Sequence, residues 1–449
     1  MHADKISTPG AAPAAEPSWL NKLGPGLITG AADDDPSGIA TYSQAGAQFG
    51  FGMLWTLILT YPLMVGIQMV SARIGRVTGH GLATNIRRHY SAWLLYPIVG
   101  LLLLANTINI AADVAAMGDA MKLVAGGKAH WYAVGFGLVS VLLQVFIPYT
   151  KYVRVLKWLT LALLAYVATV FVVHMPWAQV AKQGLALPGL PWKPAFITTI
   201  VAVFGTTISP YLFFWQASQE VEDLRADDNA HALKKAPREA RAGYTRIKLD
   251  TYIGMGFSNL VAFFIMLTTA VTLHMHGVTE IETSAQAATA LRPIAGNFAF
   301  MLFAMGIIGT GLLAIPVLAG SAAYAISGAF KWKNSLEHEP AMAPKFYGII
   351  VVATLAGVGL VFAPMDPIKA LYWSAVINGV ISIPIMAVMM LMAARTDVMG
   401  RLVITRRLKV LGWLCTAVMA AAVTAMFVTT FGQDASSFSI AAMIFSGAA

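Results

Sequence analysis

The chain has 449 residues, of which 58% are hydrophobic and 11% are charged, and its mean hydropathy is +0.69. Soluble proteins carry about 25% charged residues, so this composition excludes a soluble globular protein and is typical of an integral membrane protein. The formal net charge is +9, but the basic residues are spread over short loops, which argues against a nucleic-acid partner. Cys415 is the only cysteine, which excludes a disulfide framework and a cysteine-based metal site.

Apolar segments long enough to cross the hydrocarbon layer as helices predict an all-α protein with eleven membrane spans. Residues 1–23 lack the compact apolar run of a signal peptide, so we expect a disordered cytoplasmic tail there. The expected spans are 24–48, 51–72, 94–121, 131–149, 155–174, 194–220, 250–274, 295–329, 346–364, 368–394 and 410–431.

The basic residues predict the orientation of these spans. If the N-terminus is cytoplasmic, the outer side carries six of the 30 Lys and Arg and the inner side the other 24. The six outer residues are Lys122, Lys128, Lys182, Lys193, Arg292 and Lys369. This asymmetry follows the positive-inside rule and predicts a multi-pass protein of the plasma membrane, or inner membrane, surrounded by lipid.

The first span contains a run of carboxylates that is costly in a membrane. Residues 33–38 read Asp-Asp-Asp-Pro-Ser-Gly between apolar segments. A charge at the bilayer centre costs about 2.5–3.5 kcal/mol, and Pro36 interrupts the helical hydrogen bonds. We expect a broken helix that lines a cation site, with Asp35 and the carbonyl of Gly38 as ligands, joined by Asp34 if the backbone is unwound there. The alternative is that the run caps a helix outside the membrane.

The sixth span has a similar interruption, where residues 206–211 read Thr-Thr-Ile-Ser-Pro-Tyr. Prolines in the first and sixth of ten core helices predict an inverted repeat of five plus five helices. The two repeats would cover residues 24–174 and 194–394, and the span 410–431 would lie outside them. Thr206 and Ser209 could add hydroxyl and carbonyl ligands, although such residues also serve as ordinary helix–helix contacts.

Further polar residues lie within apolar spans. Asn106, Asn109 and Asp113 form one stripe on the third span, which predicts either a contact to the broken first helix and a cation or proton path, or a packing contact. Gln68 in the second span and Asn378 in the tenth are expected to support the helix packing through hydrogen bonds.

Several motifs resemble one family. Residues 24–27 (Gly-Pro-Gly-Leu), Asp35-Pro36 and residues 46–50 (Gly-Ala-Gln-Phe-Gly) look like the opening helix of the NRAMP divalent-metal transporters. Gln68 with residues 72–75, and residues 205–210, are similar to that family's second and sixth helices. The resemblance implies the LeuT-type inverted repeat with an eleventh helix, a divalent metal ion as substrate and no cofactor.

The departures from the family pattern affect selectivity. The family's Asp-Pro-Gly-Asn is Asp-Pro-Ser-Gly here, with Gly38 at the asparagine position, and its Met-Pro-His is Ser209-Pro210-Tyr211. The loss of the methionine removes a soft ligand and favours hard ions such as Mg²⁺ or Mn²⁺. These features resemble the magnesium-transporting branch related to the family.

Two departures also concern proton movement. The acidic residue that the family carries three positions after Asp113 is Ala116, and its histidine is Tyr211, so of these groups only Asp113 remains. The resemblance therefore implies a metal transporter that works by alternating access with weakened proton coupling.

An organic-cation transporter and an enzyme are the functions other than metal transport that such a chain could have. A transporter of the same fold that carries an organic cation or polyamine is the alternative, since the Asp run would repel a carboxylated substrate. The sequence lacks HExxH, GxSxG and paired Cys/His motifs, so an enzyme is not expected.

Overall fold

The protein is described by a computed structural model that covers residues 29–30, 32–147, 159–185, 193–227, 230–336, 339–363 and 366–431. These residues form helices and connecting loops, with no strand among them. The expected tail over residues 1–23 lies outside the described residues. Within them, eight helices are long and apolar enough to cross a membrane, and the bent pair Leu161–Val172 and Trp177–Gly184 can add a ninth.

The helices of the first half follow the predicted spans. Residues 29–30 and 32–33, which precede α2, are helical, and the later helices are separated by short loops. Their bounds are α2 Pro36–Phe49, α3 Leu54–Thr78, α4 Leu82–His89, α5 Ala92–Ala125, α6 Ala129–Phe146, α8 Leu164–Val172 and α9 Trp177–Gln179, with short non-α turns η2 Gly50–Met53, η3 Leu159–Leu163 and η4 Val180–Leu185.

The second half begins with another interrupted helix and ends with α19. The bounds are α10 Pro194–Thr207, α11 Pro210–Ala226, α12 Ala240–Thr272, α13 Ser284–Thr289, α14 Arg292–Ala295, α15 Ala299–Phe330, α16 Pro344–Leu360, α17 Pro367–Ala393, α18 Thr396–Met399 and α19 Arg406–Phe431, with η5 Pro237–Glu239, η6 His274–His276 and η7 Gly296–Phe298 between them. Every predicted span therefore has a helical counterpart in the described residues.

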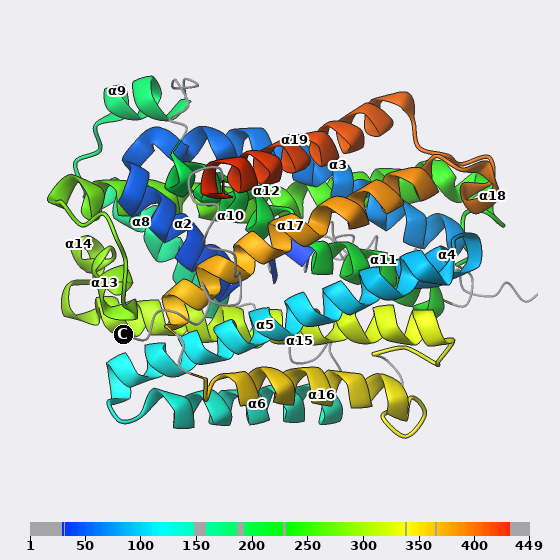
Figure 1. Cartoon of the computed structure of the whole chain (residues 1–449), viewed down its shortest axis with the longest axis horizontal. Coiled ribbons are helices and arrows are strands. Elements are labelled where there is room, and N and C mark those ends of the chain that lie inside the picture. The colour runs from blue at the N-terminus through cyan, green and yellow to red at the C-terminus, as the bar shows by residue number, and fades with distance from the viewer. Residues whose placement is uncertain are drawn as a thin grey trace, which may run out of the picture.

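The arrangement of the helices encloses the two interruptions. In Figure 1, α6 and α16 lie side by side at one edge of the bundle, next to α5 and α15, whereas α3 and α19 lie towards the opposite edge. The start of α2 and the junction of α10 and α11 lie between these layers, where α5, α12 and α17 pack against α2.

Both interruptions have the same local cause. Asp35 precedes Pro36 and has an extended backbone (φ −70°, ψ 170°), and Ser209 precedes Pro210 with φ −77° and ψ 133°. A proline disfavours the helical conformation of the residue before it, and it is well suited to the first position of a helix. Each proline therefore ends one helix segment and begins the next.

The structure differs from the predicted boundaries in two places. The first break lies at Asp34 and Asp35, whereas Pro36 to Gly38, which the sequence placed within the break, already belong to α2. The helix α12 begins at Ala240, ten residues before the predicted span. Its first turns carry polar residues such as Arg246 and Lys248, which the prediction from hydropathy left out. Polar helical turns continue a span beyond its apolar part, so hydropathy alone underestimates the helix length.

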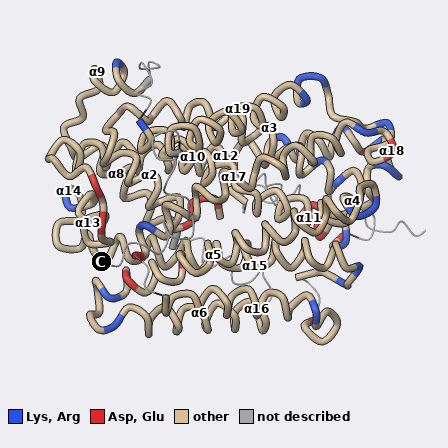
Figure 2. The backbone as a smooth tube through the Cα atoms, in the orientation of Figure 1, with Lys and Arg blue, Asp and Glu red and all other residues tan. Residues whose placement is uncertain are grey.

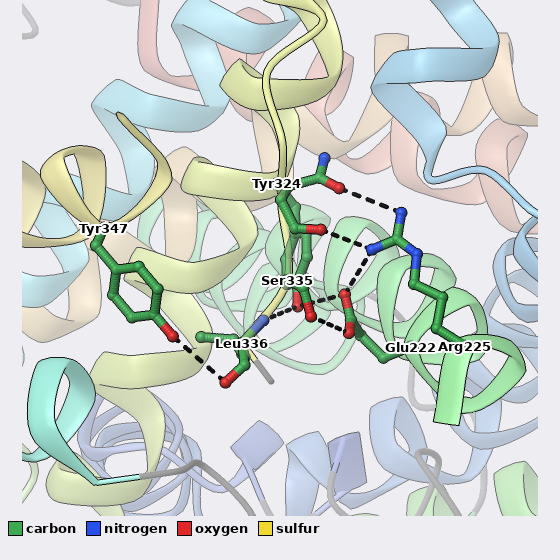
Figure 3. Close-up of polar contacts among 7 residues, drawn as sticks. Glu222, Arg225, Tyr324, Ser335, Leu336 and Tyr347 are labelled. Atoms are coloured by element: carbon green, nitrogen blue, oxygen red, sulfur yellow. Dashed lines mark hydrogen bonds and ion pairs between the residues drawn. The ribbon is translucent and has the colours of Figure 1, made fainter. Parts of the chain in front are cut away.

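A polar network holds one end of α11. The side chain of Glu222 accepts hydrogen bonds from Tyr324 (3.2 Å) and Ser335 (2.5 Å) and pairs with Arg225 (3.0 Å) (Figure 3). Arg225 also donates to the carbonyl oxygen of Asn334 at 2.6 Å. The segment after α15 is thereby fixed to the end of α11. Figure 2 shows that Lys and Arg gather at this end of the bundle, near α4 and α18.

Candidate functional site

Asp35 is buried, and both of its carboxylate oxygens accept hydrogen bonds. Its Oδ1 accepts a hydrogen bond from the backbone N–H of Gly38 at 2.7 Å, which caps α2. Its Oδ2 accepts from the Asn109 side chain of α5 at 3.0 Å and from the Tyr211 hydroxyl of α11 at 3.3 Å. Asp35 is 2% exposed. The predicted contact between the polar stripe of the third span and the first break is therefore present.

The other two carboxylates of the run face a different helix. The hydroxyl of Ser258, on α12, lies 2.6 Å from Oδ2 of Asp33 and 3.1 Å from Oδ1 of Asp34. The backbone is helical at Asp33 and extended at Asp35, so the direction of the chain changes between the pair and Asp35. The structure thus divides the run into Asp35, beside α5 and α11, and the pair Asp33 and Asp34, beside α12.

Asp113 lies near Asp35 without a hydrogen-bond partner. It is fully buried, and neither of its carboxylate oxygens is bonded to another described residue. Asp113 is close enough to Asp35 for the two carboxyl groups to interact electrostatically. The Oδ1 of Asn109, one turn before Asp113 on α5, is also buried and unpaired. Unpaired buried oxygen atoms are costly, so their grouping here favours a positively charged ligand.

The helices next to the two breaks approach one another at Gly38, in the first turn of α2, and Thr206, in the last turn of α10. A methyl group on Gly38 would lie 3.3 Å from Oγ1 of Thr206, which is closer than most such contacts. Glycine therefore permits the close approach of α2 to the end of α10. The predicted ligand positions Asp35, Gly38 and Thr206 come from two helices that are distant in sequence, and the structure brings them together.

The side chain of Ser209 is bonded to the backbone of the same helix end. Its hydroxyl donates to the carbonyl oxygens of Gly205 (2.8 Å) and Thr206 (2.9 Å), within its own chain segment. These carbonyls lie in the last turn of α10, where no further N–H of the helix can reach them. The side chain of Ser209 therefore completes the end of α10 in this structure.

The supporting residues have separate roles. The hydroxyl of Tyr211 donates to Asp35 and lies 3.3 Å from the carbonyl oxygen of Ala32, so α11 is tied to both sides of the first break. Gln68 donates to the carbonyl oxygen of Leu212 at 3.0 Å, which joins α3 to the first turn of α11. Asn378 is buried on α17, and its Oδ1 has no partner among the described residues.

Sequence reasoning did not single out two residues that lie beside the breaks. Ser258 bonds Asp33 and Asp34, and a single serine in a long apolar helix gives no signal of such a contact. Met117, on α5, is the second residue. A methyl group on Gly311 would lie 2.4 Å from the sulfur of Met117 and 3.4 Å from Cγ of Pro36, so both side chains adjoin Gly311. The position of Met117, four residues after Asp113, was the available indication that it shares a helix face with that carboxylate.

The donor set is rich in oxygen and poor in the usual metal-binding groups. In the described parts of the chain, no three His, Cys, Asp or Glu side chains are arranged around one metal position. An ion at the breaks would therefore take carboxylate, hydroxyl, amide and carbonyl oxygens together, which are the ligands of hard cations.

Relatives and solved structures agree with this architecture. The chain is 28% identical over 416 residues to the divalent metal cation transporter MntH of Klebsiella pneumoniae strain 342, covering 90% of this chain and 93% of the relative. A mutant of the Eremococcus coleocola manganese transporter superposes with a TM-score of 0.72 at 18% identity, covering 95% of this chain and 91% of that one.

A transporter of another family has a similar fold. Mhp1, a nucleobase-cation-symport-1 family transporter in a closed conformation, superposes with a TM-score of 0.53 at 14% identity, covering 94% of this chain and 96% of that one. The predicted LeuT-type fold is thereby confirmed.

The family model for natural resistance-associated macrophage protein-like sequences matches residues 26–429. Members of this family are membrane transporters, not enzymes, and carry metal as a substrate without a cofactor. The expected class of protein is confirmed, and the chain belongs to the Nramp family.

Proposed function

We propose that this protein carries a divalent cation, Mn²⁺ or Mg²⁺, across the plasma membrane by alternating access, with the ion held between the two helix breaks. The observation that supports this most directly is the meeting of the breaks, where Tyr211 and Asn109 converge on Asp35 and Thr206 approaches Gly38. The similar K. pneumoniae and E. coleocola proteins are named as divalent metal and manganese transporters, which agrees with the proposal.

In this proposal, Asp35 is the principal ligand. Its carboxylate would exchange a hydrogen bond from Asn109 or Tyr211 for the ion, and the backbone carbonyl of Gly38 and the hydroxyl of Thr206 would add oxygen ligands. Ser209 and Asp34 were also predicted as ligands. Each would have to leave its present hydrogen bonds to reach the ion, so we assign them a smaller part.

The selectivity is proposed to favour hard ions. The sixth-helix position occupied by methionine in the family pattern is Ser209, whose hydroxyl bonds to backbone carbonyls. The thioether of Met117 packs near Pro36 and Gly311, and we propose that it stays outside the coordination sphere. An oxygen-only site discriminates less strongly against Mg²⁺ than a site with sulfur.

Proton coupling is proposed to be weak. Ala116 has no titratable side chain, and Tyr211 is engaged with Asp35 and Ala32. Asp113 alone is left to bind and release a proton. The end of the bundle that carries α4 and α18 would face the cytoplasm, because the basic residues gather there.

The experiment is isothermal titration of the purified protein with Mg²⁺, Mn²⁺, Cd²⁺ and putrescine, combined with uptake into liposomes that contain a pH-sensitive dye. We expect Mn²⁺ and Mg²⁺ to bind to the wild type and to enter the liposomes with little proton flux. Asp35→Ala should lose both ions, whereas the control Met117→Leu should keep them. Strong Cd²⁺ uptake with matching proton influx and no Mg²⁺ flux would refute hard-ion selectivity, and binding of putrescine alone would favour an organic-cation transporter.

A further inference from the structure

Arg73 is a cation without an anion near one end of a membrane-spanning helix. It lies on α3, five residues before the helix ends at Thr78, and it is half-buried. Its Cζ lies 4.3 Å from the ring centre of Tyr244, on α12. Its Nε is buried, and among the described residues Arg73 has neither a hydrogen bond nor an ion pair, whereas Arg76, one turn further, pairs with Asp223. An unpaired and partly buried charge is costly, so this position favours an anion from outside the chain.

The residues in line with Arg73 form an apolar stripe on α3. They recur at spacings of four and seven residues, so they share one face of the helix, and they are Ile58, Pro62, Met69 and Arg73. Ile58 is 52% exposed, and Pro62 is exposed as well. Exposed apolar side chains of a membrane-spanning helix contact lipid tails. The stripe thus leads from a lipid-facing surface to a guanidinium group.

Two neighbouring helices form the sides of a groove along this stripe. The Tyr61 hydroxyl of α3 donates to the carbonyl oxygen of Tyr252, on α12, at 3.2 Å. A methyl group on Gly66 of α3 would lie 2.5 Å from Cδ2 of Leu411, on α19, and Figure 1 shows α19 running along α3. Five residues turn a helix by about 140°, so α12 and α19 lie on different sides of α3. The exposed stripe lies between them.

The polar end of this groove carries two further cations. Lys248, on α12, is exposed one turn after Tyr244. The hydroxyl of Tyr244 donates to the carbonyl oxygen of Leu402 at 3.4 Å, so the segment that leads into α19 adjoins this end of α12. Arg407 is exposed in the first turn of α19. Three helices therefore each bring one basic side chain to the same end of the groove, namely Arg73, Lys248 and Arg407.

The sides of the groove become apolar beyond these cations. Arg407, Leu411 and Leu414 are spaced by four and three residues and share one face of α19, and Leu414 is 49% exposed although it is apolar. On α12, Tyr252 is exposed one turn after Lys248. Each side thus presents a basic residue followed by an apolar one, in the order that a phospholipid presents its phosphate group and its acyl chains.

We propose that this groove binds an anionic phospholipid, with the phosphate group at Arg73, Lys248 and Arg407 and an acyl chain along the apolar stripe of α3. Basic side chains at the membrane surface attract anionic lipids, and a guanidinium binds phosphate oxygens through parallel hydrogen bonds. A free phosphate ion would meet the cations but would leave the apolar part of the groove uncovered. None of these residues lies at the helix breaks, so the lipid site is independent of the transported ion.

The test is thermal unfolding of the purified full chain in dodecyl maltoside micelles that contain increasing amounts of dioleoyl phosphatidylglycerol. Dioleoyl phosphatidylcholine is the matched lipid, because it has the same acyl chains and no net charge. A ligand that binds only the folded state raises the melting temperature, so we expect a saturable rise with phosphatidylglycerol and little change with phosphatidylcholine. Inorganic phosphate at the same concentrations should have no effect.

Three variants locate the site. Arg73→Gln and Arg407→Gln should each raise the half-saturating amount of phosphatidylglycerol about fivefold, the effect of one basic contact at a membrane surface. Arg88→Gln is the control, because it removes an exposed charge from α4 at the same end of the bundle, and it should respond like the wild type.

Four results would reject the lipid site. Phosphatidylglycerol has no effect on the wild type, or phosphatidylcholine or inorganic phosphate stabilises the wild type as strongly. The response to phosphatidylglycerol survives unchanged in both Arg73→Gln and Arg407→Gln, or Arg88→Gln weakens it as much as they do, which would show attraction to the net charge alone.

Discussion

The hydroxyl of Tyr211 lies 3.3 Å from Oδ2 of Asp35, and the two residues are the second residue of α11 and the cap of α2. This contact joins the two broken helices across 176 positions of sequence. In the proposed exchange of the Tyr211 hydrogen bond for an ion, this contact links the occupancy of the site to the position of α11.

Removal of the Tyr211 hydroxyl should loosen this link. In Tyr211→Phe we expect the free energy of unfolding to fall by about 1 kcal/mol, the typical worth of one hydrogen bond, and the affinity for Mn²⁺ to change. Tyr372→Phe is the control, because the Tyr372 hydroxyl contacts Thr199 at 2.8 Å rather than a predicted ligand. Titration of both variants with Mn²⁺ measures the difference, and equal affinities would contradict a role for Tyr211 at the site.

Asp35 should be the most sensitive position for metal binding. Loss of a residue that only orients a ligand typically costs 10–100-fold in metal affinity, so loss of the ligand itself should cost about 100-fold or more. Asp35→Asn keeps the size of the side chain and removes its charge, and it should lose Mn²⁺ binding in isothermal titration while remaining folded. Retention of wild-type affinity in Asp35→Asn would show that the ion binds elsewhere.

The close packing of α10 against α17 makes a separate prediction about stability. A methyl group on Gly205 would lie 2.0 Å from the carbonyl oxygen of Ala375, so Gly205→Ala must separate the two helices. We expect the free energy of unfolding of Gly205→Ala to fall by about 1–3 kcal/mol, as in other overpacked cores. Gly348→Ala is the control, since its added methyl group meets nothing within 4 Å and alanine favours a helix by about 1 kcal/mol. Thermal unfolding should show opposite shifts for the two variants.

The network around Glu222 should also matter for stability. Glu222→Ala would leave Arg225, Tyr324 and Ser335 without their common acceptor (Figure 3). Removing the acceptor of buried hydroxyl donors typically costs about 1–3 kcal/mol, and the pair with Arg225, whose side chain is 46% exposed, adds little to this. The melting temperature of Glu222→Ala should therefore fall clearly, and an unchanged value would show that the loop after α15 is held by other contacts.

An exposed ion pair provides the contrast. Arg395 donates to both oxygens of Asp397 (2.9 and 2.6 Å) and lowers the pKa of Asp397 from its ordinary value to about 2. A lowered pKa stabilises the folded state above the ordinary pKa and ceases to do so as the pH falls through about 2. Any stabilisation by this pair should therefore be constant between pH 5 and 8. Because exposed pairs contribute little, Asp397→Asn should leave the melting temperature unchanged over this range.

Much of the fold could be predicted from the sequence because a membrane imposes simple rules. The length of the apolar segments predicted the membrane spans, and each span has a helix in the described residues. The two prolines predicted the positions of both breaks to within a few residues. Surface helices such as α4 and α13 were not predicted, since their amphipathic pattern is short. The start of α12 at Ala240 was also missed, because that end of the helix is polar.

The site could be predicted only in part. Asp35, Asn109 and Tyr211 were singled out from their positions, and the structure brings them together. The division of the Asp run was not foreseeable, because it depends on the extended backbone at Asp35 and on Ser258, which is 225 positions from Asp33. Ser209 was expected to face the cavity, and only the structure shows its bonds to Gly205 and Thr206.

The hydroxyl of Ser209 has a consequence for the hydration of an incoming ion. A broken helix offers carbonyl oxygens that can replace the water molecules around a cation, but those of Gly205 and Thr206 already accept from Ser209. An ion that reaches this point finds fewer oxygens to exchange for water, so we expect it to keep part of its hydration shell. Mg²⁺ gives up its water reluctantly, and a site that does not demand full dehydration is the kind that it can enter and leave.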